Sequence, residues 1–234
     1  MDIPLEVTLK DLYVGKQMEV FHKKQVLCRH CRGTGAENFD DVKKCGTCQG
    51  SGRVVTERRQ GNMIFQQQAT CNTCGGTGQT IATKCSVCGG SKISHGSEYL
   101  PLFVEKGMSD GQRITFRGAC DQQPDTHPGD LHFVITTQRH PTFAREGNNL
   151  RIKMQITLLE ALVGFSKTLR HLDGHEFTVA RTAITIPGFV QKIPQEGMPI
   201  HEATTFGDLF VEYSIRFPKQ LSDAQKQAFR ELLR

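Results

Sequence analysis

Eight cysteines lie between residues 28 and 92, in four pairs whose members are separated by two residues. A two-residue gap in a tight turn lets two thiolates bind one metal ion, and two such pairs complete a tetrahedral four-thiolate zinc site. Glycines follow each pair and allow the positive φ with which the chain folds back on itself. The spacing predicts two zinc ions per chain but allows three ways of combining the pairs, which are Cys28/Cys31, Cys45/Cys48, Cys71/Cys74 and Cys85/Cys88.

Two other kinds of cysteine chemistry use the same spacing. A disulfide scaffold suits a small secreted domain, but the start MDIPLEV lacks the basic residues and the apolar core of a signal peptide. A redox site needs an open thiol of low pKa, whereas four matched pairs with full ligand sets favour closed structural sites. A zinc-dependent thiol-disulfide oxidoreductase is therefore the second hypothesis for function.

The net charge of +5 raises the question of nucleic-acid binding. Residues 28–92 hold nine Lys and Arg against four Asp and Glu, and the rest of the chain holds twenty of each. Eight thiolates with two zinc ions would bring the total to about +1. Phe39 and Phe65 are the aromatic residues of this stretch, which leaves little for bases to stack on. We therefore expect no nucleic-acid partner, and no apolar run approaches the roughly 20 residues that a membrane span needs.

The segments that precede the cysteines are predicted to be β-strands. Residues 3–9 and 17–27 alternate apolar and polar side chains, and between them Thr8 and Asp11 have capping-box spacing before Gly15, which predicts one helical turn. The segment VTLKDLYVG at 7–15 recurs as ITLLEALVG at 156–164, and GDLHFVIT at 129–136 resembles GDLFVEYSI at 207–215. These echoes indicate an internal duplication.

Short strands and frequent turns predict a mainly β fold with two small β-sandwich domains in series. We expect the first domain to comprise residues 1–27 and 93–139, interrupted by a zinc-finger insertion at 28–92, and the second to comprise 140–217, with Asp173-Gly174 as a two-residue hairpin turn. Residues 218–234 read as a short C-terminal helix, capped by Ser222 and Gln225 and carrying the apolar stripe Ala224, Ala228, Phe229 and Leu232.

The sequence predicts that the protein is not an enzyme. Its nine histidines are scattered, and no HExxH, GxSxG or phosphate-binding P-loop occurs. Cys120, the ninth cysteine, is expected to be structural. Small β domains offer instead an apolar face and a strand edge, to which an extended peptide can add as a further strand.

The tandem CxxCxGxG units resemble the cysteine-rich region of type I J-domain co-chaperones, the DnaJ family in the heat shock protein 40 class. The segments GMSDGQRITFRG, HPGDLHF and HPTFAREGNNL extend the resemblance over essentially the whole chain. The resemblance implies that the first pair joins the fourth and the second joins the third. Site one would then contain Cys28, Cys31, Cys85 and Cys88, and site two Cys45, Cys48, Cys71 and Cys74. The fourth unit, CSVCGGSK, lacks the last glycine, and we expect only the loop after Cys88 to loosen.

The same resemblance implies a non-enzymatic co-chaperone fragment that binds non-native polypeptide and delivers it to a DnaK-type heat shock protein 70 chaperone. No helical domain with a His-Pro-Asp loop precedes Met1, so the chain is expected to be a fragment that does not alone stimulate that partner's ATPase. The family dimerises through its carboxyl end, and the apolar stripe of the last helix predicts a weak homodimer. The start of the chain carries no signal, which predicts a cytoplasmic location.

For the client site, the resemblance brings Val20, His22, Leu100 and Phe133 to one apolar groove. If Phe21 packs into the core, alternation places Met18 with Val20 and His22 on the groove side. The alternative is that these are ordinary core residues. His22 departs from the aliphatic residue of relatives, so His22→Leu is expected to tighten binding of an apolar peptide.

Overall fold

The computed structural model describes residues 1–60 and 63–232 and is mainly β, as the sequence predicts. Positions 233 and 234, the end of the predicted C-terminal helix, lie outside the described residues. None of the helices among the described residues combines the length and the apolar content that a membrane span requires. The elements are β1 (Asp2–Val7), α1 (Leu9–Val14), β2 (Lys16–Leu27), η1 (Phe39–Asp41), β3 (Val42–Lys44), β4 (Arg53–Gln60), β5 (Met63–Thr70), β6 (Gln79–Ile81), β7 (Ile93–Val104), β8 (Arg113–Phe116), β9 (Leu131–Thr137), β10 (Phe143–Glu146), β11 (Asn149–Thr157), α2 (Leu158–Val163), β12 (Phe165–Arg170), β13 (Glu176–Arg181), β14 (Val190–Ile193), β15 (Leu209–Arg216) and α3 (Asp223–Leu232).

The chain forms two compact units. The cysteine unit contains residues 1, 20–100 and 115–132, and the helical unit contains residues 2–19, 101–114 and 133–234. The cysteine unit holds β3 to β6, and the helical unit holds α1, α2 and α3. The predicted boundaries of the two sandwiches, 1–27 with 93–139 and 140–217, stay a prediction.

Two short helices repeat one local design. The Thr8 hydroxyl accepts from the Asp11 backbone and the Asp11 carboxylate accepts from the Thr8 backbone, both at 3.1 Å. Thr157 and Glu160 make the same reciprocal pair in front of α2, at 3.2 and 2.7 Å. Each pair satisfies two helix N-terminal donors that would otherwise lack partners. The predicted helical turn is therefore confirmed, and so is its repetition.

The strand order repeats as well. One sheet has the order β1-β9-β8, and another has the order β10-β11-β15-β14, in which β11-β15-β14 repeats the first arrangement. The two-stranded sheets β2-β7 and β12-β13 correspond in the same way. β11 and β15 run parallel from Leu150↔Leu209 to Thr157↔Arg216, and both bury alternate side chains, such as Leu150 and Leu209. The repeat seen in the sequence is therefore also present in the strand order of the sheets.

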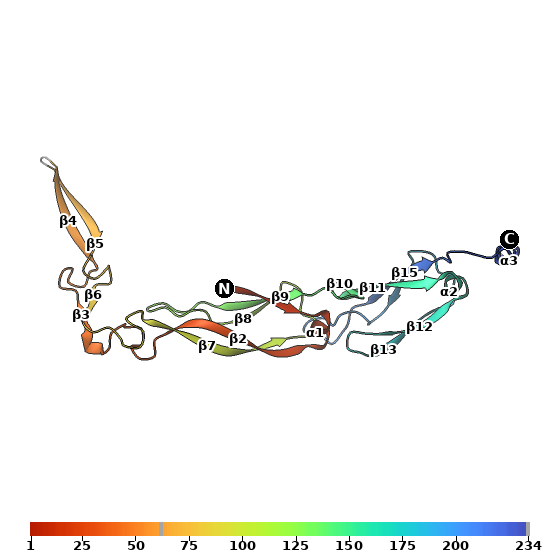
Figure 1. The fold of residues 1–234 in the computed structure, drawn as a ribbon, viewed down its shortest axis with the longest axis horizontal. Helices are drawn as coiled ribbons and strands as arrows, with labels where there is room; N and C mark the ends of the chain where they lie inside the picture. The colour runs from red at the N-terminus through yellow and green to blue at the C-terminus, as the bar shows by residue number, and fades with distance from the viewer. Residues whose placement is uncertain (61–62, 233–234) are drawn as a thin grey trace. The chain divides into compact units, whose positions relative to one another are not determined.

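The cysteine-rich stretch is inserted between β2 and β7. Inside it, β3 pairs with β6 and β4 pairs with β5, both antiparallel, and Figure 1 shows β4 and β5 as one hairpin. In the second copy of the repeat, the turn between β12 and β13 occupies the same place in the strand order. The insertion therefore replaces a tight turn and leaves the order of the strands unchanged.

That turn in the second copy is longer than predicted. Arg170 pairs with Glu176, and the His171 backbone N–H donates to His175 O at 2.8 Å, so three residues separate the last bonded pair. Gly174 N–H donates to His171 O at 3.1 Å, and Gly174 has a φ of +101°. This combination is a turn followed by a glycine bulge, so the predicted two-residue Asp173-Gly174 turn is wrong by one residue.

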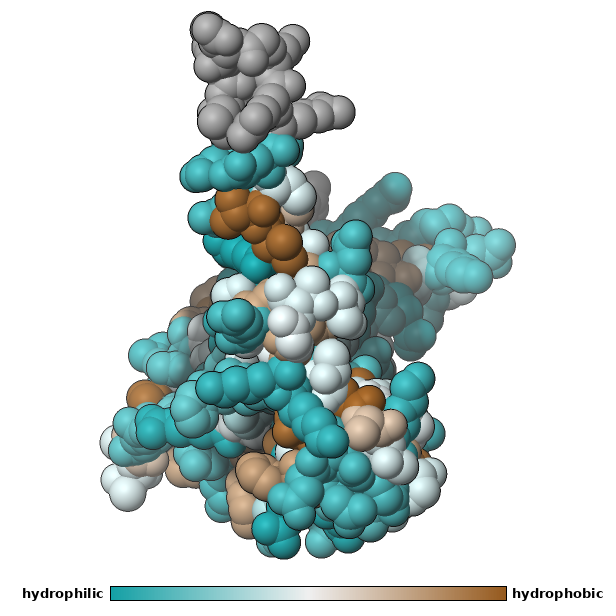
Figure 2. All heavy atoms as spheres, turned by 90° about the vertical axis from the view of Figure 1, so that its left-hand side faces the viewer, coloured by the Kyte–Doolittle hydropathy of each residue, from teal (hydrophilic) through white to brown (hydrophobic). Residues whose placement is uncertain are grey.

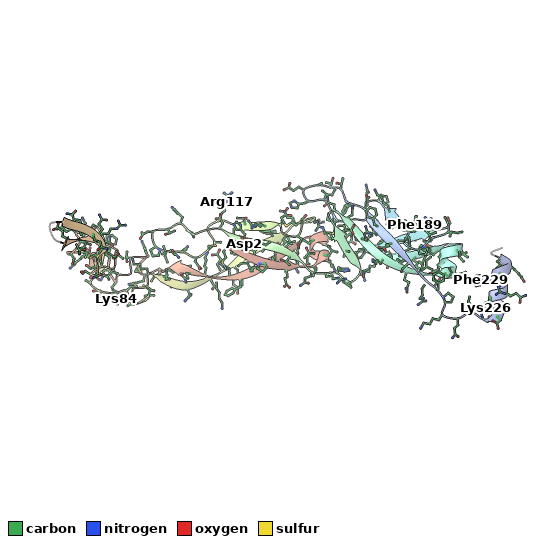
Figure 3. All side chains as sticks on the ribbon, turned by 90° about the horizontal axis from the view of Figure 1, so that it is seen from above. Asp2, Lys84, Arg117, Phe189, Lys226 and Phe229 are labelled. Atoms are coloured by element: carbon green, nitrogen blue, oxygen red, sulfur yellow. The ribbon has the colours of Figure 1, made fainter. Side chains whose placement is uncertain are left out.

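Helix α3 ends the described chain. Ser222 and Gln225 form the predicted reciprocal cap, with hydrogen bonds of 2.9 and 3.3 Å. The helix has no buried residue, and Phe229 and Leu232 are exposed; Figure 3 labels Phe229 on it. Packing within the described chain therefore does not explain the apolar side chains of α3. Figure 2 faces the side that lies at the left of Figure 1, and there hydrophilic side chains dominate while hydrophobic ones gather in small groups.

Candidate functional site

Each cysteine pair sits in the same compact turn. The residue three positions after the second cysteine is Thr34, Ser51, Thr77 or Ser91, and its hydroxyl donates to the carbonyl of that cysteine at 2.7 to 2.8 Å. Its backbone N–H donates to the same carbonyl at 3.0 to 3.1 Å. Sequence reasoning noted the glycines but missed these hydroxyls, although a Thr or Ser recurs at that position in all four units.

The glycines that end the second and third units have a steric reason. A Cβ on Gly52 would lie 2.3 Å from Gly76 O, and a Cβ on Gly78 would lie 2.3 Å from Gly50 O. In the fourth unit Lys92 stands at this position and still adopts a φ of +69°. A side chain in the left-handed region costs roughly 1–2 kcal/mol. The structure therefore shows the turn retained at Lys92, where the sequence predicts a looser loop.

The turns bring the eight cysteines into two groups of four. One group contains Cys28, Cys31, Cys85 and Cys88, and the other contains Cys45, Cys48, Cys71 and Cys74. This is the combination that the resemblance implies among the three that spacing allows. Between the pairs, the sulfur–sulfur distances are 3.9 Å (Cys28–Cys85), 3.7 Å (Cys31–Cys88), 3.8 Å (Cys45–Cys71) and 3.7 Å (Cys48–Cys74).

These distances fit one particular kind of metal site. With zinc–sulfur bonds of about 2.3 Å, the sulfurs of a tetrahedral site lie about 3.8 Å apart. A disulfide would instead need about 2.05 Å between sulfurs, and the cysteines are free. Two four-cysteine groups that could each hold a metal ion are therefore present, and their geometry suits zinc.

Backbone amides favour the ionised thiolates that a metal needs. The N–H of Cys48 is the main cause that lowers the pKa of Cys45, to about 6. At Cys74 burial acts to raise the pKa, but hydrogen bonds from Gly78 and Gly76 outweigh it and lower the pKa; the Gly78 N–H lies 3.3 Å from the sulfur. Burial raises the pKa of Cys85 to about 11. Ionising all four thiols of its group therefore requires a bound cation.

A carboxylate fastens the first group. Glu37 accepts from the Ser86 backbone N–H at 2.6 Å and from the Ser86 hydroxyl at 3.1 Å, and its other contact is His30 at 3.1 Å. The Ser86 backbone is the main cause that lowers the pKa of Glu37. Since Ser86 lies next to Cys85, Glu37 ties the first cysteine turn to the fourth. In the second group Thr47 and Thr73 hydroxyls, 3.0 Å apart, make the corresponding connection.

Strand β2 faces the opposite way from the prediction. Phe21 is 48% exposed and its ring lies 5.1 Å from that of Tyr99, whereas His22 is 8% exposed. The premise that Phe21 packs into the core is wrong, because the two aromatic rings cover each other on the outer face. Alternation puts Met18 and Val20, both half-buried, on the same side as His22.

The other predicted groove residues are buried. Leu100 is 5% exposed and Phe133 is 1% exposed, so a client would reach Phe133 only after its covering side chains moved. His22 Nε2 is buried without a hydrogen-bond partner among the described residues. The structure thus places these side chains in interior positions, and their contact with a client stays a prediction.

One edge of β2 is partly closed. β2 pairs with β7 in a two-stranded sheet. On its other side, the Gln25 N–H donates to Asp121 Oδ1 at 2.7 Å and the Leu27 N–H donates to Gln122 Oε1 at 3.1 Å. Since backbone groups alternate sides along a strand, those of Phe21 and Lys23 point the same way as those of Gln25. This stretch of edge has no strand partner in the part of the chain that the structure describes.

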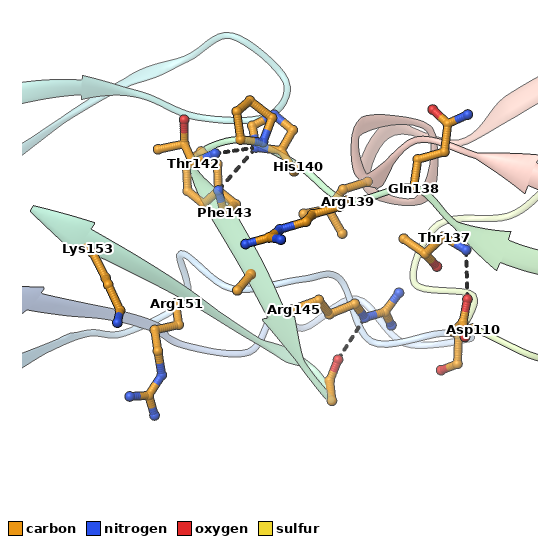
Figure 4. A pocket seen from close by; sticks show the side chains of 15 residues that line it. Asp110, Thr137, Gln138, Arg139, His140, Thr142, Phe143, Arg145, Arg151 and Lys153 are labelled. Carbon is orange, nitrogen blue, oxygen red and sulfur yellow. Dashed lines mark hydrogen bonds between the residues drawn. The ribbon is translucent and has the colours of Figure 1, made fainter.

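The helical unit has a cavity of about 780 Å³ beside β10 (Figure 4). Arg145 lines it, but donates to the backbone oxygens of Gly107, Met108 and Gly147 at 2.6 to 3.0 Å. Asp110 accepts from the Thr137 N–H at 2.7 Å. The side chains of Arg145 and Asp110 thus hold neighbouring backbone groups in place.

Comparison with known proteins agrees with this architecture. The family described as "DnaJ C terminal domain" matches residues 1–218. The chain is 39% identical to "Chaperone protein dnaJ 3" of Arabidopsis thaliana, over 98% of this chain and 56% of the relative. It is 38% identical to "DnaJ protein homolog 1" of Allium porrum, over 98% and 59%, and 36% identical to "DnaJ protein ERDJ3B" of Arabidopsis thaliana, over 98% and 59%. The chain therefore spans a little over half the length of these relatives. With its strand order, its four cysteine turns and this similarity along nearly its whole length, the chain belongs to the DnaJ C-terminal domain family.

Proposed function

We propose that this chain is the client-binding part of a co-chaperone, which holds non-native polypeptide and delivers it to a heat shock protein 70 chaperone of the DnaK type. The observation that carries the proposal is the similarity over 98% of the chain to a protein named as a chaperone. Because the chain spans 56% of that relative, delivery to the partner chaperone rests on the family and not on a site described above. The cytoplasmic location stays a prediction.

The client would bind by strand addition along the free part of β2. The backbone groups at Phe21 and Lys23 would pair with an extended peptide whatever its sequence, which suits a protein that holds many unfolded chains. Selection of apolar residues would fall to side chains on β2 and β7, with Val20, His22 and Leu100 as the predicted lining. Met18 and Phe133 complete the predicted set.

The two four-cysteine groups would each hold one structural zinc ion. This stretch has little apolar core, because its buried residues are mainly the cysteines themselves. The zinc ions would supply cross-links that hold it folded in place of such a core. Cys28, Cys45 and Cys71 have no exposed surface, and Cys85 is 1% exposed. Buried thiols in complete ligand sets do not favour the alternative of a thiol-disulfide oxidoreductase.

A test is the aggregation of a chemically unfolded client that contains no cysteine, measured by light scattering with the zinc-loaded chain present. We expect suppression that is unchanged after exposed thiols are blocked with N-ethylmaleimide. Absence of suppression at a several-fold molar excess of the chain would overturn the proposal. Loss of suppression on thiol blocking, with zinc retained, would favour thiol chemistry instead.

A further inference from the structure

Two exposed aromatic side chains lie together on the outer face of the β2–β7 sheet. Phe21 in β2 is 48% exposed and Tyr99 in β7 is 67% exposed, and their ring centroids lie 5.1 Å apart with the planes inclined at 53°. The Lys23 ammonium nitrogen lies 6.0 Å from the centre of the Phe21 ring, at the limit of a cation–π contact. Half of the Phe21 side chain therefore stays in solvent, where a further apolar group could cover it.

The backbone of Phe21 points to the open edge of β2. Cys28, directly after β2, donates its N–H to the carbonyl of the residue just before β7 at 3.0 Å, so even-numbered residues of β2 turn their backbone groups toward β7. The Gln25 N–H donates to Asp121 at 2.7 Å, which places odd-numbered residues on the other edge. Tyr99 thus adjoins Phe21 from β7, and the sheet order of the described residues has no strand on the other side of Phe21.

A strand added at this edge would place its side chains by the same alternation. Opposite residues of adjacent strands lie on the same face of a sheet, whether the strands run parallel or antiparallel. The client residue opposite Phe21 would therefore lie on the outer face, with its Cβ about 5 Å from that of Phe21. The residues before and after it in the client would point to the inner face, on the side of Val20 and His22.

We propose that Phe21 and Tyr99 form an aromatic subsite on the outer face, at which Phe21 selects an aromatic side chain on the bound client. This inference rests on the proposed strand addition and names the class of segment that binds. An aromatic client residue would extend the pair to a row of three rings across the sheet, in the tilted or offset contacts that aromatic rings favour. Aromatic pairs of this kind stabilise neighbouring strands.

The preferred client segment is then apolar on both of its faces. One side chain meets the predicted inner lining, and the next residue along the client packs on Phe21. Continuous apolar runs are typical of strands that are buried on both faces of a native protein, whereas strands with one face in water alternate apolar and polar residues. The subsite would therefore favour segments that become accessible only when a client unfolds.

The test uses heptapeptides that carry one leucine and, next to it, a variable residue X among serines, where X is Phe, Leu or Ser. Their affinities for the zinc-loaded chain are measured by calorimetry. We expect the Phe peptide to bind roughly three- to tenfold more tightly than the Leu peptide, because ring pairing adds to apolar burial, and the Ser peptide to bind most weakly.

Two variants show whether the Phe21 ring causes this preference. Phe21→Leu keeps an apolar side chain but removes the ring, so it should bring the ratio of Phe to Leu affinity close to one. Tyr99→Leu changes β7 alone and should lower the ratio, because Phe21 loses the ring that orients it. Phe39→Leu is the matched control, since Phe39 is 83% exposed but lies outside this sheet, and it should keep the wild-type ratio.

Each outcome decides the proposal. A ratio near one in the wild type, with both peptides bound, would overturn the aromatic subsite and leave strand addition intact. A preference for Phe that persists in Phe21→Leu would also overturn it, since another part of the chain would then recognise the ring. If none of the three peptides binds up to millimolar concentration, the proposed strand addition itself fails.

Discussion

At the scale of single residues, the cysteines differ in role although their types are identical. Eight of them converge in two groups, whereas Cys120 donates to Asp130 O at 3.1 Å and joins neither group. Each sulfur in a group of four completes a tetrahedral ligand set, so loss of one weakens that site alone.

Cys45→Ser is therefore expected to lower the zinc content from two ions per chain to one, measured by elemental analysis after purification under reducing conditions. Cys120→Ser is the matched control and should retain two ions. Two zinc ions in Cys45→Ser, or none in the freshly purified wild type, would contradict the assignment of structural zinc to these groups.

His22 is the second residue that tests the structure. Its Nε2 is buried without a partner among the described residues, which costs free energy that an apolar side chain of similar size does not. His22→Leu should raise the free energy of unfolding by about 1 kcal/mol in chemical denaturation of the zinc-loaded chain. Phe21→Leu, on the exposed face, should change it by less than about half as much. A destabilised His22→Leu would show that the imidazole has a partner in solution.

At the scale of elements, the capped helices α1 and α2 are local structures with a local cause. Thr8→Ala and Thr157→Ala should each lower the free energy of unfolding by about 1 kcal/mol at pH 7, since each removes the hydroxyl that accepts from the third helical residue. Thermal and chemical denaturation both measure this. Equal stability of either variant and wild type would contradict the role of the caps.

The α1 cap also has a pH dependence with a definite sign. Burial acts to raise the pKa of Asp11, but hydrogen bonds from Thr8 and Lys16 outweigh it and hold the pKa below its usual value. A lowered folded-state pKa stabilises the protein above the unfolded value of about 3.9, and this contribution is lost as the pH falls through the folded value. The stability difference between wild type and Asp11→Asn should therefore stay nearly constant above about pH 4 and shrink as the pH falls below it, through the lowered folded-state pKa of Asp11. Zinc release in acid affects both proteins and largely cancels; a difference that grows would contradict the assignment.

Local signals explain which parts of the fold could be predicted. Capping spacing at Thr8 and Ser222 depends on neighbouring residues and is visible in sequence, as is the repeat. Which face of β2 is buried could not be predicted from such local signals. The alternation of KQMEVFHKKQVL allows either face to be the buried one, and only the Phe21–Tyr99 contact in the structure decides between them. Cysteine spacing alone left three pairings, and only the family resemblance selected one of them.

At the scale of the whole molecule, α3 poses the question of assembly. Leu158, Leu162, Phe217, Leu221 and Phe229 line a common pocket beside this helix, and Phe217 is 62% exposed. An apolar surface of this kind favours a partner, and a second copy of the chain fits the predicted weak homodimer. Phe229→Asp should abolish dimers seen by sedimentation at high micromolar concentration, while Gln227→Asp, on the opposite helix face, should not. A wild type that stays monomeric there would contradict the prediction.

Addition of a client as a strand to β2 can be followed at single residues by amide hydrogen exchange. The zinc-loaded chain is compared with and without an excess of an extended apolar peptide. We expect slower exchange of the Phe21 and Lys23 amides, which point to the open edge, and little change at Gln25, whose amide already donates to Asp121. Protection confined to β4 and β5, or no protection at Phe21 and Lys23 when peptide is bound, would rule out strand addition at β2.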